Sequence, residues 1–94
     1  MKIRWTRLAV QDLNYAAEFI AADNPSAAES IITRIEQALD TLAKHPEIGR
    51  PGRIKTTREL VVTSTPFIIP YRIKGAEIHL LAVLHGKRKW PESL

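Results

Sequence analysis

The sequence has 94 residues, of which 45% are hydrophobic and 26% charged, a composition typical of one small folded domain. It contains no cysteine, which excludes disulfide bonds and thiolate metal sites and agrees with a reducing compartment. No apolar run approaches the roughly 20 residues that a membrane-spanning helix needs. The basic N-terminus is not followed by the apolar stretch of a secretory signal. We therefore expect a single cytoplasmic domain over residues 1–94.

The net charge of +4 is unevenly distributed along the chain. Residues 1–43 carry four basic and six acidic side chains, a net charge of −2. Residues 44–94 carry ten basic and four acidic side chains, a net charge of +6. A basic half on a small domain is expected where a surface meets nucleic acid or an acidic partner. A generic soluble basic surface explains the charge alone equally well.

The N-terminal half predicts one strand followed by two helices. Residues Lys2–Trp5 alternate and include β-prone types, which indicates a short strand. The Thr6 hydroxyl can cap the helix that follows, and Asp23-Asn24-Pro25 separates that helix from a second one ending at Lys44-His45-Pro46. The apolar positions recur at helical spacing, as Ala9, Leu13, Ala16, Ala17 and Ile20, then Ala28, Ile31, Ile32, Ile35, Leu39 and Leu42. So short a connection predicts an antiparallel helical hairpin.

The C-terminal half predicts a loop and an antiparallel meander. Residues Pro46–Thr57 are rich in proline, glycine and cations, and are expected to form an exposed loop. Three strand-like runs follow, over Arg58–Thr63, Phe67–Ile73 and Glu77–His85. Pro70 cannot donate to a sheet ladder, so we expect a local irregularity there. The order β-α-α-β-β-β predicts an α+β fold, an antiparallel sheet packed against the N-terminal helical hairpin.

Strand alternation predicts which side chains enter the core. One face of the middle run carries Phe67, Ile69, Tyr71 and Ile73, and one face of the last run carries Ile78, Leu80, Ala82 and Leu84. The opposite face of the last run is mixed, with Glu77, His79, Leu81, Val83 and His85. Part of that second face should therefore meet solvent or a partner.

Three segments resemble the RelE/ParE toxins: Arg58–Val62 (RELVV), Pro66–Ile73 (PFIIPYRI) and Val83–Pro91 (VLHGKRKWP), the last like the family's closing strand and basic turn. The resemblance covers essentially the whole chain. It implies the toxin of a bacterial type II toxin–antitoxin system, neutralised by an antitoxin usually encoded by an adjacent gene. Family members divide between ribosome-dependent mRNA cleavage and poisoning of DNA gyrase, and fold alone does not choose between these activities.

The resemblance also suggests which residues a nuclease would use. RelE-like nucleases resemble one another in placing lysines and arginines on the central strands and a tyrosine near the C-terminus. Arg88 matches a basic position after the last strand, Lys55 or Arg58 matches the earlier cluster, and His85 is a candidate general acid.

Two departures favour the other branch of the family. Ile68 stands where those nucleases carry a strand arginine, and no tyrosine follows Tyr71. We therefore favour a ParE-like toxin directed at gyrase or another non-nucleolytic target. The alternative is a ribosome-dependent, metal-independent mRNA endonuclease that uses His85 and Arg88.

Binding residues are predicted at two places. Candidates for contact with the target or with phosphate are Lys55, Arg58, Arg72, Lys87, Arg88 and Lys89. The turn Lys87–Lys89 follows a strand directly, and Trp90-Pro91 would anchor the tail onto the sheet; a solvated basic run is the alternative. Tyr15 and Phe19 lie outside the core stripe of the first helix and are candidate antitoxin anchors.

The remaining polar residues predict structural roles. His45 would cap a helix end, His79 alternates with apolar neighbours, and for His85 a hydrogen bond at a strand end is the alternative to catalysis. Three scattered histidines without ligand spacing predict no metal site, and the absence of a glycine-rich phosphate loop predicts no cofactor. A third possibility, a non-toxic nucleic-acid-binding module, lacks a recognition helix because both helices use their regular faces for the core.

Overall fold

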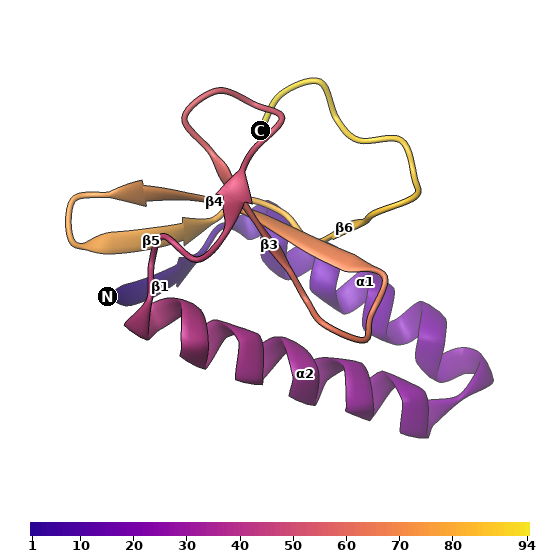
Figure 1. Ribbon diagram of the computed structural model, residues 1–94. Coiled ribbons are helices and arrows are strands. Elements are labelled where there is room, and N and C mark those ends of the chain that lie inside the picture. The colour runs from indigo at the N-terminus through magenta and orange to yellow at the C-terminus, as the bar shows by residue number, and fades with distance from the viewer.

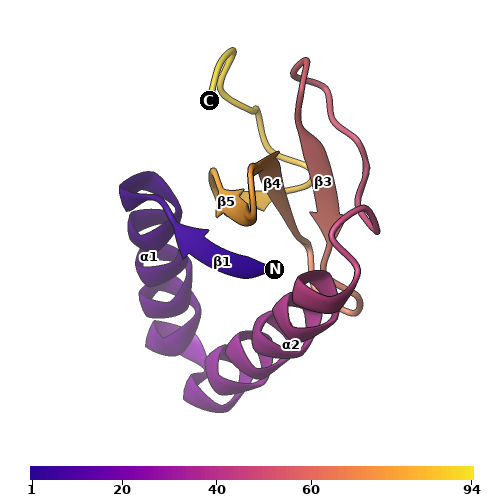
Figure 2. The ribbon, with the colours of Figure 1, turned by 90° about the vertical axis from the view of Figure 1, so that its left-hand side faces the viewer.

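The computed structural model describes all 94 residues as a six-stranded sheet with two helices on one of its sides (Figures 1 and 2). The elements in chain order are β1 (Lys2–Trp5), α1 (Arg7–Asp23), α2 (Pro25–Lys44), β2 (Arg50–Pro51), β3 (Arg58–Val61), β4 (Phe67–Lys74), β5 (Glu77–Leu80) and β6 (Leu84–His85). The predicted α+β class, helical hairpin and first strand are confirmed. Neither helix is long and apolar enough to cross a membrane.

Capping side chains define where the helices begin. The Thr6 hydroxyl accepts a hydrogen bond from the Ala9 N–H at 3.2 Å, so α1 starts at the next residue after the cap. The Asn24 side chain accepts from the Ala27 N–H at 3.1 Å, and Pro25 occupies the first position of α2. Asn24 alone separates the two helices, which makes the predicted hairpin tight.

The sheet is mixed, which corrects the expectation of an entirely antiparallel one. Its strand order is β1-β5-β4-β3-β2, and β1 runs parallel to β5, with Trp5 opposite Leu80. The two strands therefore end side by side. There the Thr6 hydroxyl and N–H both donate to the Leu80 carbonyl, at 2.7 and 3.2 Å. These bonds direct α1 away from the sheet edge and back across its face.

The predicted last strand is broken opposite Pro70. Tyr71 lies opposite Leu80, whereas Ile68 lies opposite Leu84. Between these pairs, the three residues 81–83 lie opposite the two residues 69–70, so the register shifts by one. The Pro70 carbonyl accepts from the Leu81 N–H at 2.9 Å, but proline has no N–H to donate in return. The irregularity expected at Pro70 is confirmed, and it divides the strand into β5 and β6.

The bulge changes which residues face the helices. Val83 joins Ile78 and Leu80 in the core cluster, while the predicted Ala82 is fully buried but outside that cluster and the predicted Leu84 is half-buried. His85 lies opposite Phe67 with their ring centroids 6.0 Å apart, so it also lies on the helix side of the sheet. The predicted faces of the last strand are thus correct before the bulge and wrong after it. The core cluster consists of Ala9, Ile35, Leu39, Leu42, Leu60, Val62, Phe67, Ile69, Tyr71, Ile78, Leu80 and Val83.

Candidate functional site

Tyr15 and Phe19 form an exposed aromatic pair on α1. They are one helical turn apart, their rings stack with centroids 6.4 Å apart, and their side chains are 69% and 60% exposed. Exposed apolar side chains that gather in one patch are candidates for contact with a partner. The structure thus places the two predicted antitoxin anchors side by side on the surface.

The aromatic pair borders a groove of about 370 Å³ between α1 and the β6 end of the sheet. The groove is mostly apolar, and its lining includes the core residues Phe67 and Val83. Its other side carries His85, Arg88 and Lys89. Residues predicted for two separate roles, antitoxin binding and target binding, therefore line one groove.

The turn Lys87–Lys89, which we call the basic turn, is held at both ends. Before it, the Gly86 N–H donates to the Pro66 carbonyl at 2.8 Å. After it, the Trp90 indole N–H donates to the His85 carbonyl at 3.3 Å. The three cationic side chains of the turn are exposed. The predicted anchoring role of Trp90 is confirmed by this contact.

The other predicted cations lie elsewhere. The Arg58 guanidinium donates to the carbonyls of Gly49 and Glu47 at 2.9 and 3.2 Å, which fixes the loop before β2. Tyr71 pairs with Arg58 and shares its face of the sheet, so the next residue, Arg72, points to the opposite face. The Arg72 Nε donates to the Thr56 hydroxyl at 3.3 Å. Arg58, Arg72 and the exposed Lys55 do not line the groove.

All three histidines make contacts that support the structure. His79 lies 3.1 Å from Glu77, and hydrogen bonding from its ring lowers the pKa of that carboxyl. His45 is the C-cap of α2, and its N–H donates to the Thr41 carbonyl at 2.9 Å. His85 Nδ1 accepts from the Lys87 N–H at 3.2 Å. Histidine, aspartate and glutamate side chains form no cluster of three or more that could hold a metal ion.

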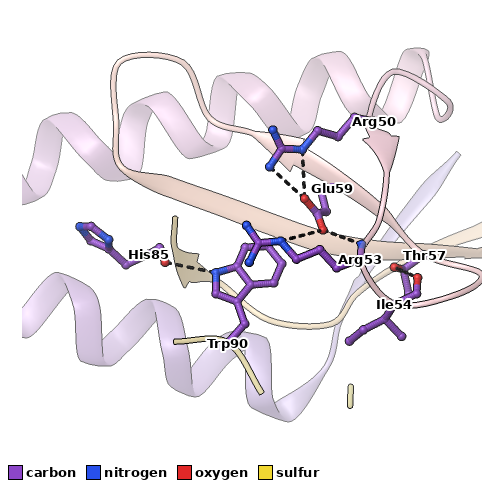
Figure 3. A network of polar contacts seen from close by, with 7 residues as sticks. All are labelled: Arg50, Arg53, Ile54, Thr57, Glu59, His85 and Trp90. Carbon is purple, nitrogen blue, oxygen red and sulfur yellow. Dashed lines mark hydrogen bonds and ion pairs between the residues drawn. The ribbon is translucent and has the colours of Figure 1, made fainter. Parts of the chain in front are cut away.

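A second group of polar residues was not predicted from the sequence. Glu59 is only 2% exposed, and it bonds to Arg50 of β2 and to Arg53 of the loop that follows, while Arg53 lies over the ring of Trp90 (Figure 3). The sequence places Glu59 on the face of β3 away from the helices, which is normally solvated. The signal available was the direct cross-strand position of Arg50, but the short strand β2 was not predicted.

Comparison with known proteins agrees with this architecture. Residues 3–90 match the model of the family described as the ParE toxin of the type II toxin–antitoxin system parDE. The chain is 46% identical to a proposed toxin, Y4kP of Sinorhizobium fredii, over 99% of this chain and 96% of that protein. It is 34% identical to toxin RelE2 of Caulobacter vibrioides, over 93% of this chain and 97% of that one.

A solved structure is also similar. It comes from the chromosomal ParDE system of P. aeruginosa, and superposes with a TM-score of 0.78 and 29% identity over 88% of this chain and 92% of its own. The family model and the relatives span nearly the whole domain, the groove and the basic turn included. The chain therefore belongs to the RelE/ParE family and is the toxin component of a type II toxin–antitoxin system.

Proposed function

We propose that this toxin arrests bacterial growth by acting on DNA gyrase or another target without cleaving RNA. The observation that carries the proposal is the dispersal of the cations that a nuclease would need. Arg58 and Arg72 lie on opposite faces of the sheet, and the carbonyls of the loop occupy the Arg58 guanidinium. Gyrase and the ribosome are both cytoplasmic in bacteria, so the proposal includes a cytoplasmic location.

Metal-free RNA cleavage places strict demands on geometry. A base must reach the ribose 2′-hydroxyl, an acid must reach the leaving oxygen, and cations must converge on the phosphate. Ile68, at the position where the resemblance would place a strand arginine, is 8% exposed and lies under Gly86 at the start of the tail. An arginine there would have to displace the tail, so this face of β4 supports packing more than phosphate binding.

The alternative function is ribosome-dependent mRNA cleavage, and one observation favours it. His85 and Arg88 line the same groove, and the Arg88 N–H donates to the His85 carbonyl at 3.1 Å. A histidine beside an arginine could protonate a leaving oxygen while the guanidinium stabilises the phosphate. Membership in a toxin family leaves the non-toxic nucleic-acid-binding module without support.

The groove between α1 and β6 is the proposed antitoxin site. Its floor is apolar and its far side is cationic, which suits an amphipathic segment with acidic residues along one edge. An antitoxin encoded by the adjacent gene would cover the basic turn when it occupied this groove. Neutralisation would then follow from blocking the surface that reaches the target.

Two assays on the purified toxin distinguish the targets. We expect the toxin to inhibit supercoiling by gyrase, and to leave mRNA intact in a translating extract analysed by primer extension. Toxin already bound to its antitoxin serves as the control and should be inactive in both assays. Codon-periodic cleavage with unaffected supercoiling would reverse the order of the two functions.

A further inference from the structure

The ion pairs around Glu59 have no role in the groove described above. The Glu59 side chain lies opposite Pro70, on the sheet face away from the helices, and is almost completely buried. Its Oε1 accepts from Arg50 Nε at 3.0 Å, and its Oε2 accepts from the Arg53 backbone N–H at 2.9 Å (Figure 3). Replacing a buried ion pair by apolar groups is often neutral or stabilising. Stability alone is therefore a weak reason for this arrangement.

The two carboxylate oxygens hold different segments. Arg50 lies directly opposite Glu59 in the β2–β3 register, so the Oε1 contact joins strands that are already paired. Arg53 lies beyond β2, and its guanidinium carbon is 3.7 Å from the centroid of the Trp90 ring. A guanidinium over an indole is attracted by the electron-rich face of the ring. Arg53 therefore joins two parts of the chain: its backbone N–H bonds to Glu59 in the sheet, and its guanidinium contacts Trp90 in the C-terminal tail.

Trp90 connects this network to the basic turn. In Figure 3 its ring lies between Arg53 and His85, and its N–H bonds to the His85 carbonyl. Beyond Gly86, the hydrogen bonds of the tail run back to His85, at the start of the turn. The stacking of Trp90 on Arg53 thus ties the far end of the turn to a distant part of the chain.

We infer that Glu59 is a positioning residue for toxicity: through Arg53 and Trp90 it holds the basic turn Lys87–Lys89 in the shape that meets the target. The inference rests on the proposed role of the basic turn in growth arrest. Fixing a turn before binding removes the entropy that would otherwise be lost when it orders on the target. Arg53, which looks like a free surface cation in the sequence, serves instead to arrange the three cations of the basic turn.

The test uses the full-length toxin with Trp5→Phe, so that Trp90 is the sole tryptophan. Arg53→Ala removes the stacking but keeps the backbone N–H that bonds to Glu59. We expect acrylamide to quench Trp90 fluorescence more strongly in Arg53→Ala than in the Trp5→Phe parent. We also expect growth arrest to need about tenfold more toxin, the factor that corresponds to freeing roughly one residue of backbone. Glu59→Gln should change both readouts in the same direction.

The matched control is Arg50→Ala, which breaks the Oε1 contact and leaves the path through Oε2 intact. It should lower the unfolding midpoint, yet leave Trp90 quenching and growth arrest at the parent level. Trp90→Phe keeps an aromatic ring under the guanidinium and should retain more activity than Trp90→Ala. A purely structural role for Glu59 would instead make activity follow the unfolding midpoint in every variant.

Two outcomes would overturn the inference. One is full growth arrest by Arg53→Ala when increased Trp90 quenching shows that its tail is loosened; the other is unchanged Trp90 quenching in Arg53→Ala. Arg53 is 53% exposed, so its substitution decides the matter even if Glu59→Gln fails to fold. A triple alanine substitution of Lys87–Lys89 that keeps full toxicity would overturn the proposed site itself, and with it the inference. If the triple variant loses toxicity but Arg53→Ala and Trp90→Ala remain fully toxic, only the inference is overturned and the proposed site stands.

Discussion

The carboxylate of Asp12 on α1 accepts a hydrogen bond from the backbone N–H of Val83 at 3.0 Å. Val83 lies in the bulge between β5 and β6, where the shift in register leaves it outside the regular ladder. A backbone N–H without a partner in this buried position would be costly. Asp12 therefore makes the bulge possible and fastens α1 to the strand end that carries His85.

This contact predicts a difference between two substitutions of Asp12. Asp12→Ala leaves the Val83 N–H unsatisfied and should lower the free energy of unfolding by about 1–3 kcal/mol, measured by urea denaturation. Asp12→Asn keeps an oxygen acceptor and should lose less. Asn14→Ala, on the exposed part of the same helix, is the control and should stay within about 0.5 kcal/mol. Equal losses for Asp12→Ala and Asn14→Ala would contradict the role of this hydrogen bond.

Features encoded by neighbouring residues were predictable, and features that join distant segments were not. The caps at Thr6 and Asn24 and the irregularity at Pro70 follow from the chemistry of a few adjacent residues. The parallel pairing of β1 with β5 depends on contacts across more than 70 residues. Its direction is decided by how the helical hairpin returns to the sheet.

The site was missed for a related reason. A one-residue shift at the bulge exchanges the two faces of a strand, so His85 and Val83 point where alternation alone would not place them. That exchange brings His85 to the groove beside Tyr15 and Phe19. Each of the three side chains was identified from the sequence, but their common location required the long-range register.

The buried hydroxyl of Tyr71 links the loop to the sheet. It donates to the Pro46 carbonyl at 2.7 Å and accepts from the Gly49 N–H at 2.9 Å. Tyr71→Phe should lower the free energy of unfolding by about 1–3 kcal/mol, because both groups lose their partner. Tyr15→Phe, which changes an exposed tyrosine, is the control and should have little effect. A Tyr71→Phe protein as stable as the parent would mean that water replaces the hydroxyl.

The same residue predicts a dependence of stability on alkaline pH. Burial raises the pKa of the Tyr71 hydroxyl above its ordinary value of 10.0, although bonding to Gly49 and the charge of Arg58 oppose the shift. As the pH rises, Tyr71 therefore ionises in the unfolded chain before it does so in the folded one. Its contribution to the free energy of unfolding is complete below about pH 10 and is lost as the pH rises through the folded-state pKa. Unfolding measured from pH 8 to 11 should show a smaller alkaline loss for Tyr71→Phe than for the parent. Identical slopes would exclude a contribution from Tyr71.

The aromatic pair on α1 predicts where the antitoxin binds. Tyr15→Ala combined with Phe19→Ala should weaken the complex by a few kcal/mol in calorimetry, as expected for anchor residues that line an apolar binding groove. The toxin should stay folded, because both side chains are exposed. Val10→Ala removes another exposed apolar side chain of α1 outside the groove and should leave the affinity unchanged. If the double variant binds normally, the antitoxin uses a different face.

The role of His85 depends on the target. Its Nδ1 accepts a hydrogen bond from the Lys87 N–H, and its backbone carbonyl accepts from the Arg88 N–H and the Trp90 indole. Removing the ring therefore breaks only the contact with Lys87 and keeps the two bonds to the carbonyl. His85→Ala should therefore retain most growth arrest if the toxin acts on gyrase. Complete inactivity with a normal unfolding midpoint would indicate that the ring acts chemically, as in a nuclease. Growth curves after induction, with soluble toxin quantified, provide the measurement.

Arg88 is the residue on which we expect activity to depend most. It lies at the centre of the basic turn, is exposed, and lines the rim of the groove, so its guanidinium is available to phosphate or to an acidic protein surface. An exposed side chain of this kind contributes within about 0.5 kcal/mol to folding, and a rim contact contributes little to affinity for the antitoxin. Arg88→Ala should thus abolish growth arrest while thermal unfolding and antitoxin binding stay close to those of the parent. Arg34→Ala, which removes an exposed arginine from α2, is the matched control and should remain fully toxic. Full toxicity of Arg88→Ala would show that the target is bound elsewhere on the domain.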